Sequence, residues 1–263
     1  MLPRDRICAA LARGASAEKS AAAKRSPALV AFVTAGYPEP REFLSVLRAV
    51  AGAADAVEIG VPFSDPMADG VTIQRSSQHA IEHGVSLTWI LDQLARRDFE
   101  LTSPVLLMSY LNPLLAFGLE KLAARAAEVG VSGVIVPDLP YEESAPLRAA
   151  LDTRGLALVQ LVTPATPPER LRSLCAASQG FVYAVTRTGI TGGESTLPPE
   201  TSQYLAAVKA ASQVPVCAGF GVRRPDQVAT IARHADGVIV GSALVEVLER
   251  GEDPARFLRS LRG

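Results

Sequence analysis

Glu58 stands near the end of the apolar segment 56–60, and two more carboxylates, Asp65 and Asp69, follow it in the next loop. The segment has the composition of a β-strand, in which alternate residues point to opposite faces. In a parallel sheet both faces are covered, so a carboxyl group there loses water and its pKa rises. An uncharged residue would cost less at that position. We therefore interpret Glu58 as a general acid or base at the end of a strand.

Two glycine-containing turns in the last third of the chain suggest a phosphate site. Gly219-Phe220-Gly221 follows one predicted strand, and Gly241-Ser242 follows the next and precedes a predicted helix. Glycine lets backbone N–H groups approach an anion, and the positive end of a helix dipole attracts it. Tight turns without a ligand remain the alternative for either turn alone. Together, at the last two strands, they predict a phosphate-binding site.

A set of apolar and aromatic residues lies near predicted strand ends. Spacing by two places Met108 with Tyr110, and Ile135 with Pro137, on single faces of their strands. These residues could simply fill a core, but their position near strand ends favours a flat pocket. Such a pocket beside a phosphate site implies a ligand with an aromatic end and a phosphorylated tail. The set comprises Phe32, Met108, Tyr110, Ile135, Pro137, Leu161 and Tyr183.

Short apolar or β-branched segments alternate with amphipathic ones along the chain. Strands are predicted at residues 29–34, 56–60, 105–110, 133–136, 157–162, 181–185, 216–219 and 237–240. Helices between them are predicted at 40–51, 119–129, 168–177, 199–211 and 225–233. This alternation is typical of an α/β fold, a (β/α)8 TIM barrel. A doubly wound open sheet usually has fewer strands and a Gly-rich turn after the first one, which is absent here.

We expect a single barrel domain that covers residues 1–263. Residues 2–13 predict an extra N-terminal helix that closes the bottom of the barrel, and residues 14–26 predict a connector rich in Ala and Ser. Two long loops, 61–69 and 187–198, follow strands and therefore belong to the C-terminal face, where barrel active sites lie. The glycines of the second loop suit a mobile lid.

The composition excludes several classes of function. The 263 residues are 48% hydrophobic and carry a net charge of −1, which gives no basic surface for nucleic acid or an anionic membrane. No apolar run approaches the roughly 18 residues that a membrane span needs. The N-terminus lacks the layout of a secretory signal, so we expect a cytoplasmic protein.

Neither the histidines nor the cysteines predict a metal site. His79 and His83 have the spacing of two ligands on one helix face, but no third ligand accompanies them, and we interpret them as surface residues of a helix. Cys8, Cys175 and Cys217 are widely separated and form no CxxC motif. They are typical of reduced thiols in the cytoplasm.

With these features together, the chain closely resembles the family of tryptophan synthase α subunits. Segment 58–70, Glu-Ile-Gly-Val-Pro-Phe-Ser-Asp-Pro-Met-Ala-Asp-Gly, matches the family signature almost residue for residue. The resemblance extends over nearly everything after the connector. Further matching segments, in order from the first predicted strand to the eighth, are 32–38, 138–144, 187–192, 219–222 and 241–243.

The resemblance implies a carbon–carbon lyase of tryptophan biosynthesis, which cleaves indole-3-glycerol phosphate to indole and glyceraldehyde 3-phosphate in a retro-aldol reaction. It implies no metal or organic cofactor for this subunit. Glu58 would be the catalytic acid and base, and Asp69 would hold the indole N–H. Protonation of the ring carbon puts positive charge on the ring nitrogen, which an ionised carboxylate stabilises. We expect Asp69, on a loop, to be better solvated than Glu58 and to stay ionised.

The resemblance also assigns residues that bind substrate. The apolar set above would line the indole and glycerol site, and Thr191 would be the lid residue that meets the loop 61–69. We interpret Asp65 as a turn or interface residue and Asp138 as a partner of neighbouring backbone. The phosphate positions would be Gly192, Phe220, Gly221, Gly241 and Ser242.

The family works as an αββα heterotetramer in which a β subunit with pyridoxal phosphate receives indole through an internal passage. The resemblance implies contact with that subunit through loops 61–69, 111–118 and 187–198. Loop 111–118 is apolar for a surface loop, which suits a contact patch, although a locally packed turn explains it equally well.

Three alternatives remain open on sequence alone. The chain could be a standalone indole-3-glycerol-phosphate lyase that releases free indole. It could be a non-catalytic activator of the β subunit, although Glu58 and Asp69 argue against that. It could also be another phosphate-binding barrel, such as a thiamine-phosphate or indole-glycerol-phosphate synthase, but those lack the Pro-Phe-Ser-Asp-Pro loop.

Overall fold

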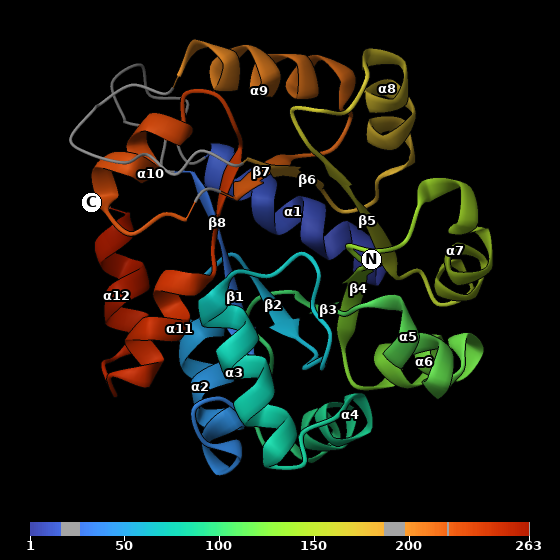
Figure 1. The fold of residues 1–263 in the computed structure, drawn as a ribbon, viewed down its shortest axis with the longest axis vertical. Coiled ribbons are helices and arrows are strands. Elements are labelled where there is room, and N and C mark those ends of the chain that lie inside the picture. Colours follow the sequence, from blue (N-terminus) through green and yellow to red (C-terminus); the bar gives the residue numbers. More distant parts are fainter. Residues whose placement is uncertain (17–26, 187–197, 220, 263) are drawn as a thin grey trace.

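The computed structural model describes residues 1–16, 27–186, 198–219 and 221–262 (Figure 1). In these ranges the strands pair in parallel and close into a barrel in the order β1 to β8. The barrel closes where β1 pairs with β8, with Ala28 opposite Gly237. The strands are β1 (Ala28–Thr34), β2 (Ala56–Gly60), β3 (Val105–Met108), β4 (Val131–Ile135), β5 (Ala157–Val162), β6 (Val182–Val185), β7 (Val216–Gly219) and β8 (Gly237–Val240).

Helices surround the barrel (Figure 1), and the predicted TIM barrel is confirmed. Short 3-10 helices precede α2 and α7, as η1 (Pro40–Glu42) and η2 (Tyr141–Glu143). The α-helices are α1 (Pro3–Ser16), α2 (Phe43–Ala51), α3 (Val71–Glu82), α4 (Leu87–Arg96), α5 (Leu111–Phe117), α6 (Leu119–Glu128), α7 (Ala145–Asp152), α8 (Pro168–Ala177), α9 (Pro199–Ala211), α10 (Pro225–Ile231), α11 (Ser242–Glu249) and α12 (Pro254–Leu261).

The extra N-terminal helix is also confirmed, and α1 closes one end of the barrel. Its Ile7 and Leu11 are fully buried in the same cluster as the inward residues Ala28 and Cys217. A Cβ on Gly180, just before β6, would lie 3.1 Å from the Ile7 side chain. Helix α1 therefore covers the end at which the strands begin, and the opposite end holds the loops that follow the strands.

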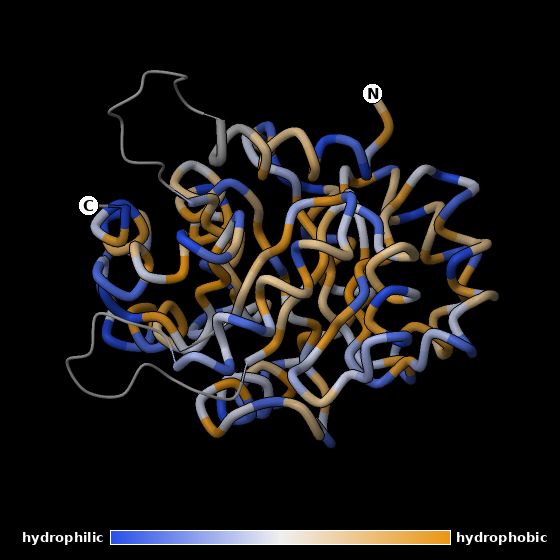
Figure 2. Tube along the Cα trace, turned by 90° about the horizontal axis from the view of Figure 1, so that it is seen from above, coloured by the Kyte–Doolittle hydropathy of each residue, from blue (hydrophilic) through white to orange (hydrophobic). Residues whose placement is uncertain are grey.

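Two apolar layers hold the fold together. An inner cluster fills the barrel, with Val30, Leu106 and Phe181 among its members. A larger cluster lies between the barrel and the helices, with Val57 and Ile59 among its members. Figure 2 shows the hydrophobic segments gathered toward the inside and hydrophilic ones toward the outside. Strands covered on both faces explain why their sequences are nearly continuous apolar runs.

The prediction of a surface loop at 111–118 was wrong, because residues Leu111–Phe117 form helix α5. The Leu111 N–H donates to a carboxylate oxygen of Asp138 at 2.9 Å, which caps the start of the helix. Leu114 is fully buried, and Gly118 ends the helix with a φ of 90°. The strand predicted at 105–110 ends at Met108, so its last two residues lead into this helix.

Close contact between β4 and β5 makes one glycine necessary. A Cβ on Gly133 would lie 2.7 Å from the Ala157 Cβ and 2.9 Å from its carbonyl oxygen. Backbone in the middle of a closed sheet has little room to move. At normal strand spacing, position 133 therefore accepts only glycine.

We expect Gly133→Ala to lower the free energy of unfolding by about 1–3 kcal/mol, since overpacking strains neighbouring backbone. Urea unfolding measures this difference. Gly52→Ala is the matched control, because its added Cβ would meet nothing closer than 3.5 Å. The control should stay within about 0.5 kcal/mol of the unsubstituted chain. Equal stability of both variants would show that the β4–β5 contact relaxes without cost.

Candidate active site

A cavity of about 420 Å³ opens where the strands end, opposite α1. Residues from the ends of β1, β3, β6 and β8 line it, together with the loop after β2 and the start of α3. Five residues of the predicted apolar set lie in its wall: Phe32, Met108, Pro137, Leu161 and Tyr183. The cavity thus lies at the face where barrel enzymes have their active sites.

Glu58 points into the barrel. Its neighbours on the other face, Val57 and Ile59, pack in the outer cluster, whereas Ala56 packs in the inner one. The side chain is 0% exposed, and neither carboxyl oxygen has a hydrogen-bond partner among the residues that the structure describes. Burial raises the pKa of Glu58 to about 8. The carboxyl group is therefore protonated at neutral pH.

The Glu58 side chain does not line the cavity but lies directly below it. Phe32, which does line the cavity, is its register partner on β1. The Phe32 ring leans across the end of β2, since a Cβ on Gly60 would lie 2.4 Å from the ring. Burial raises the pKa of Tyr183, another wall residue, and the charges of Glu58 and Asp69 raise it further. This coupling reflects how close Glu58 lies to the cavity wall.

Asp69 lines the cavity from the loop after β2. The Tyr110 hydroxyl donates to its carboxylate at 3.2 Å, and the same hydroxyl accepts from the Ala68 N–H at 2.9 Å. Gln74 of α3 donates to the Asp69 carbonyl oxygen at 2.8 Å. These contacts hold the loop end against α3 and against the short segment between β3 and α5.

Glu58 is 0% exposed, whereas Asp69 is partly exposed, so the expectation that Asp69 is better solvated is confirmed. The side chain is half-buried, and desolvation raises the pKa of Asp69, while the hydrogen bond from Tyr110 lowers it. Asp69 therefore differs from Glu58 both in its contact with water and in its hydrogen-bond partners. Asp69 has a hydroxyl donor that stabilises its charged form, and neither Glu58 oxygen has one among the described residues.

Tyr110 and Ile135 do not line the main cavity. Tyr110 lines a side pocket of about 20 Å³ that shares Phe32, Asp69 and Met108 with the main cavity. Its ring stacks on Phe63 with centroids 5.0 Å apart. Ile135 is fully buried in the inner cluster. The structure thus places Tyr110 beside Asp69 and Ile135 in the core of the barrel.

Residues that offer mainly backbone groups form another part of the cavity wall. Gly221, Gly241 and Ser242 all line it, and α11 begins at Ser242. Gly221 has a φ of 63°, a conformation that favours glycine, and the space around it is open. This end is suited to an anion, because the first N–H groups of a helix lack partners within the helix. The predicted residues Thr191, Gly192 and Phe220, and the lid segment 187–197, lie outside the described residues.

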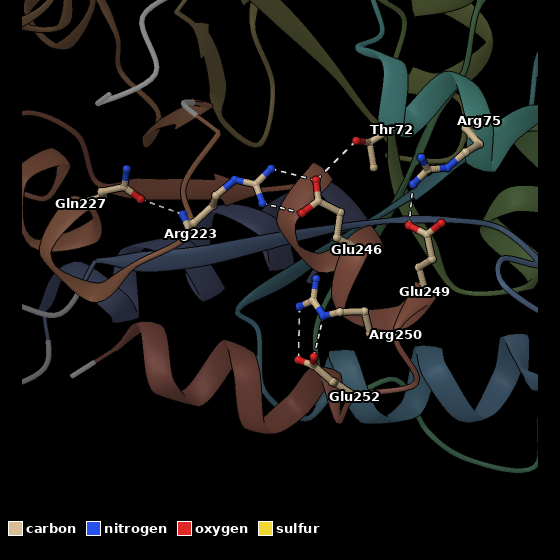
Figure 3. Close-up of polar contacts among 8 residues, drawn as sticks. All are labelled: Thr72, Arg75, Arg223, Gln227, Glu246, Glu249, Arg250 and Glu252. Carbon is tan, nitrogen blue, oxygen red and sulfur yellow. Dashed lines mark hydrogen bonds and ion pairs between the residues drawn. The ribbon is translucent and has the colours of Figure 1, made fainter. Parts of the chain in front are cut away.

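Sequence reasoning missed several residues at this end, and Arg223 is the one with charge. It lines the cavity two residues after Gly221, and Thr72 and Ile73 line it from the start of α3. Figure 3 shows Arg223 paired with Glu246 of α11. The sequence did contain a signal for this residue, because Arg223 is a cationic residue two positions after Gly221 of a predicted phosphate-binding turn.

Other candidate groups have structural partners. Asp138 caps α5 as described, and exposed Asp65 pairs with Ser64 in the same loop. The imidazoles of His79 and His83 each contact a backbone carbonyl oxygen. Among the described residues there is no cluster of three or more His, Cys, Asp or Glu that could hold a metal. Cys8, Cys175 and Cys217 are free thiols, as predicted.

A second cavity, of about 300 Å³, lies beside the ends of β4 and β5. It shares Pro137 and Leu161 with the first cavity, and its Arg170 is paired with Glu142. Neither Glu58, Asp69 nor the glycine turns border it. We take the first cavity as the candidate active site, because Asp69 and the glycine turns line it and Phe32, the register partner of Glu58, forms part of its wall.

Comparison with known proteins identifies close relatives of the chain. Residues 19–261 match the family model described as tryptophan synthase alpha chain. A tryptophan synthase alpha chain from Nitratidesulfovibrio vulgaris (strain DP4) is 44% identical over 243 residues, which cover 92% of this chain and 95% of that protein. The described helices include none long and apolar enough to cross a membrane.

Solved structures agree with these relatives. The tryptophan synthase subunit alpha from Legionella pneumophila str. Paris superimposes with a TM-score of 0.84 at 32% identity, covering 100% of this chain and 97% of that one. A chain of the tryptophan synthase complex from Pyrococcus furiosus gives a TM-score of 0.78 at 33% identity, with coverages of 89% and 96%.

The buried acid predicts a pH-dependent stability. The pKa of Glu58 rises from 4.5 to about 8 on folding, so the unfolded chain releases this proton first as the pH rises. The folded state therefore loses stability between pH 4.5 and 8, on the order of 5 kcal/mol in total. Glu58→Gln removes this loss, and its stability relative to the unsubstituted chain should increase by several kcal/mol from pH 5 to pH 8.

Urea unfolding at pH 5, 6.5 and 8 measures this change. Glu100→Gln, at an exposed position, is the matched control for removal of a glutamate. It should show no comparable change. Parallel pH dependence of the Glu58→Gln variant and the unsubstituted chain would mean that folding does not raise the pKa of Glu58.

Proposed function

The chain belongs to the tryptophan synthase alpha chain family and is a lyase of the α reaction, and on this premise we propose that Glu58 and Asp69 cleave indole-3-glycerol phosphate to indole and glyceraldehyde 3-phosphate. The observation that carries the residue assignment is the unpartnered, fully buried acid beneath the cavity. A protein gains no stability from such a group, which favours a role in proton transfer.

Glu58 supplies the proton that starts cleavage. With a pKa of about 8 its carboxyl group is neutral at physiological pH, and the protonated form is the one needed to protonate the ring carbon that carries the side chain. Rotation about its side-chain bonds past Phe32 brings the acid to the cavity floor. The resulting carboxylate then accepts the proton of the side-chain hydroxyl. The carbon–carbon bond breaks as the aldehyde forms, and its electrons return to the ring.

Asp69 stabilises the ring while it is protonated. Its carboxylate faces the cavity and receives a hydrogen bond from Tyr110, which favours the ionised form. An ionised carboxylate at the indole N–H stabilises the positive charge that develops on nitrogen. Proton donor and counter-charge are therefore separate carboxyl groups, and among the described residues only Asp69 has a hydroxyl donor that favours its charged form.

The cavity accommodates the two ends of this substrate. Phe32, Met108, Leu161 and Tyr183 provide apolar surface for an indole ring. Gly221, Gly241 and Ser242 lie at the end that suits a phosphate. We propose that Thr191, Gly192 and Phe220, which lie outside the described residues, complete the site.

We propose that residues 1–263 act as one domain, which requires no cofactor and passes indole to a β subunit with its own pyridoxal phosphate. The Pyrococcus furiosus relative comes from a tryptophan synthase complex, which supports such a partner. Met67, in the loop after β2, is 83% exposed, and Leu115 of α5 is 52% exposed on the same face. Apolar side chains at this face suit a protein contact. An αββα assembly in the cytoplasm fits these features.

The direct test is indole formation from indole-3-glycerol phosphate by the purified chain, with and without a β subunit. We expect a low rate alone and a higher rate with the partner. Glu58→Gln should lower kcat by at least about a thousandfold and leave KM nearly unchanged, because a proton donor acts in the transition state. A variant with a near-normal kcat would exclude Glu58 from proton transfer.

Asp69→Asn should lower kcat/KM by about a hundredfold, because a neutral amide stabilises the ring cation poorly. Asp65→Asn is the matched control, since this exposed aspartate of the same loop does not line the cavity. In the absence of the β subunit the control should keep its activity. Equal effects of the two substitutions would indicate a disturbed loop rather than a lost counter-charge.

A further inference from the structure

Arg223 is the charged side chain at the anion-binding end of the cavity. It lies in the segment between β7 and α10, two residues after Gly221, and lines the cavity with Gly241 and Ser242. Its guanidinium donates two hydrogen bonds to Glu246 of α11, with Nη1–Oε2 and Nη2–Oε1 distances of 2.5 and 2.8 Å (Figure 3). The pair joins two segments that both border the anion-binding end.

The Arg223–Glu246 ion pair is weak enough for the guanidinium to exchange Glu246 for another anion. The side chains are 51% and 24% exposed, and an ion pair so open to water contributes little to stability, about 0–1 kcal/mol. The two hydrogen bonds to Glu246 leave other N–H groups of the guanidinium without a partner among the described residues. A guanidinium has the planar geometry that fits two oxygens of a phosphate group.

Neighbouring arginines differ from Arg223 in their surroundings. Arg224 pairs with Asp226, and Arg250 pairs with Glu252, each two residues away in sequence. Neither arginine lines the cavity. The glutamate of the Arg223 pair, in contrast, also accepts a hydrogen bond from the Thr72 hydroxyl at 3.4 Å. Thr72 lines the same cavity from α3, so Glu246 keeps a donor when the guanidinium turns away.

We propose that Arg223 is a phosphate-binding residue, whose guanidinium moves from Glu246 to the phosphate group of the substrate. Glu246 is then a competing partner that occupies the guanidinium until a phosphate dianion replaces it. The assignment rests on the proposed cleavage of a phosphorylated substrate, and it adds a side-chain cation to an end otherwise built from backbone.

Binding of inorganic phosphate, measured by titration calorimetry, tests the proposal without catalysis. Arg223→Gln should weaken phosphate binding by about ten- to a hundredfold, the range for loss of a charge-assisted hydrogen bond. Arg224→Gln removes an equal charge from the next residue and should stay within about twofold of the unsubstituted chain. Phosphate affinity unchanged in Arg223→Gln would overturn the proposal.

Glu246→Gln separates a phosphate-binding role from a structural one by the sign of its effect. Loss of the competing carboxylate frees the guanidinium, so phosphate affinity should equal or exceed that of the unsubstituted chain. If the pair only held the loop in place, both Arg223→Gln and Glu246→Gln would weaken binding, and that result would overturn the proposal. Arg223→Lys keeps the charge without the planar fork and should fall between Arg223→Gln and the unsubstituted chain.

Kinetics distinguish this inference from the proposed reaction. Arg223→Gln should raise KM for indole-3-glycerol phosphate by about tenfold or more and change kcat little, because the phosphate is remote from the reacting bond. If the unsubstituted chain forms no indole but the phosphate affinities change as expected, the reaction assignment fails and the role of Arg223 stands. If indole forms and Arg223→Gln leaves both KM and phosphate affinity unaltered, the role of Arg223 alone fails. Thermal melting shows that each variant is folded.

Discussion

The proposed chemistry of this barrel depends on one carboxyl group that is shielded from water. Glu58 lies between β1 and β3, opposite Phe32 and Leu106, and closure of the sheet leaves its oxygens neither solvent nor a donor among the described residues. The pKa of Glu58 consequently rises to about 8. Burial of this acid lowers the stability of the fold, but it also keeps the acid protonated at neutral pH. In the proposed mechanism the apolar cluster inside the barrel is thus also what keeps Glu58 protonated.

The remaining charged groups of the site are arranged around this neutral acid. Asp69 stands above it with Tyr110 as a donor, and Arg223 with Glu246 stands at the far end beside the glycine turns. Asp69 and Arg223 thus present a carboxylate and a guanidinium to the same cavity. A ligand with an N–H at one end and a phosphate at the other has a single favourable orientation there. In the proposed reaction these two charges would orient the substrate before any bond is broken.

Alternation of apolar and amphipathic segments was sufficient to predict the barrel, because burial of strands on both faces leaves a direct mark on the sequence. Contacts between distant segments were not readable. Helix α5 was predicted as a loop because its cap comes from Asp138, 27 residues later. The hydrogen bond from Tyr110 to Asp69 was not predicted, because Tyr110 lies 41 residues later, at the start of α5. Likewise, the pairing of Arg223 with Glu246 depends on the packing of α11 and carries no local signal.

Helix α1 restricts the path by which protons can leave Glu58. With Ile7 and Leu11 fully buried in the inner cluster, the floor of the barrel is sealed by hydrocarbon. A proton that leaves Glu58 meets only apolar side chains toward α1. It therefore passes toward the cavity, to the bound molecule or to solvent. In the proposed reaction the proton of Glu58 passes to the ring carbon, and a different proton returns to Glu58 from the side-chain hydroxyl. A hydrogen isotope on that acid would therefore end on the ring carbon of the released indole.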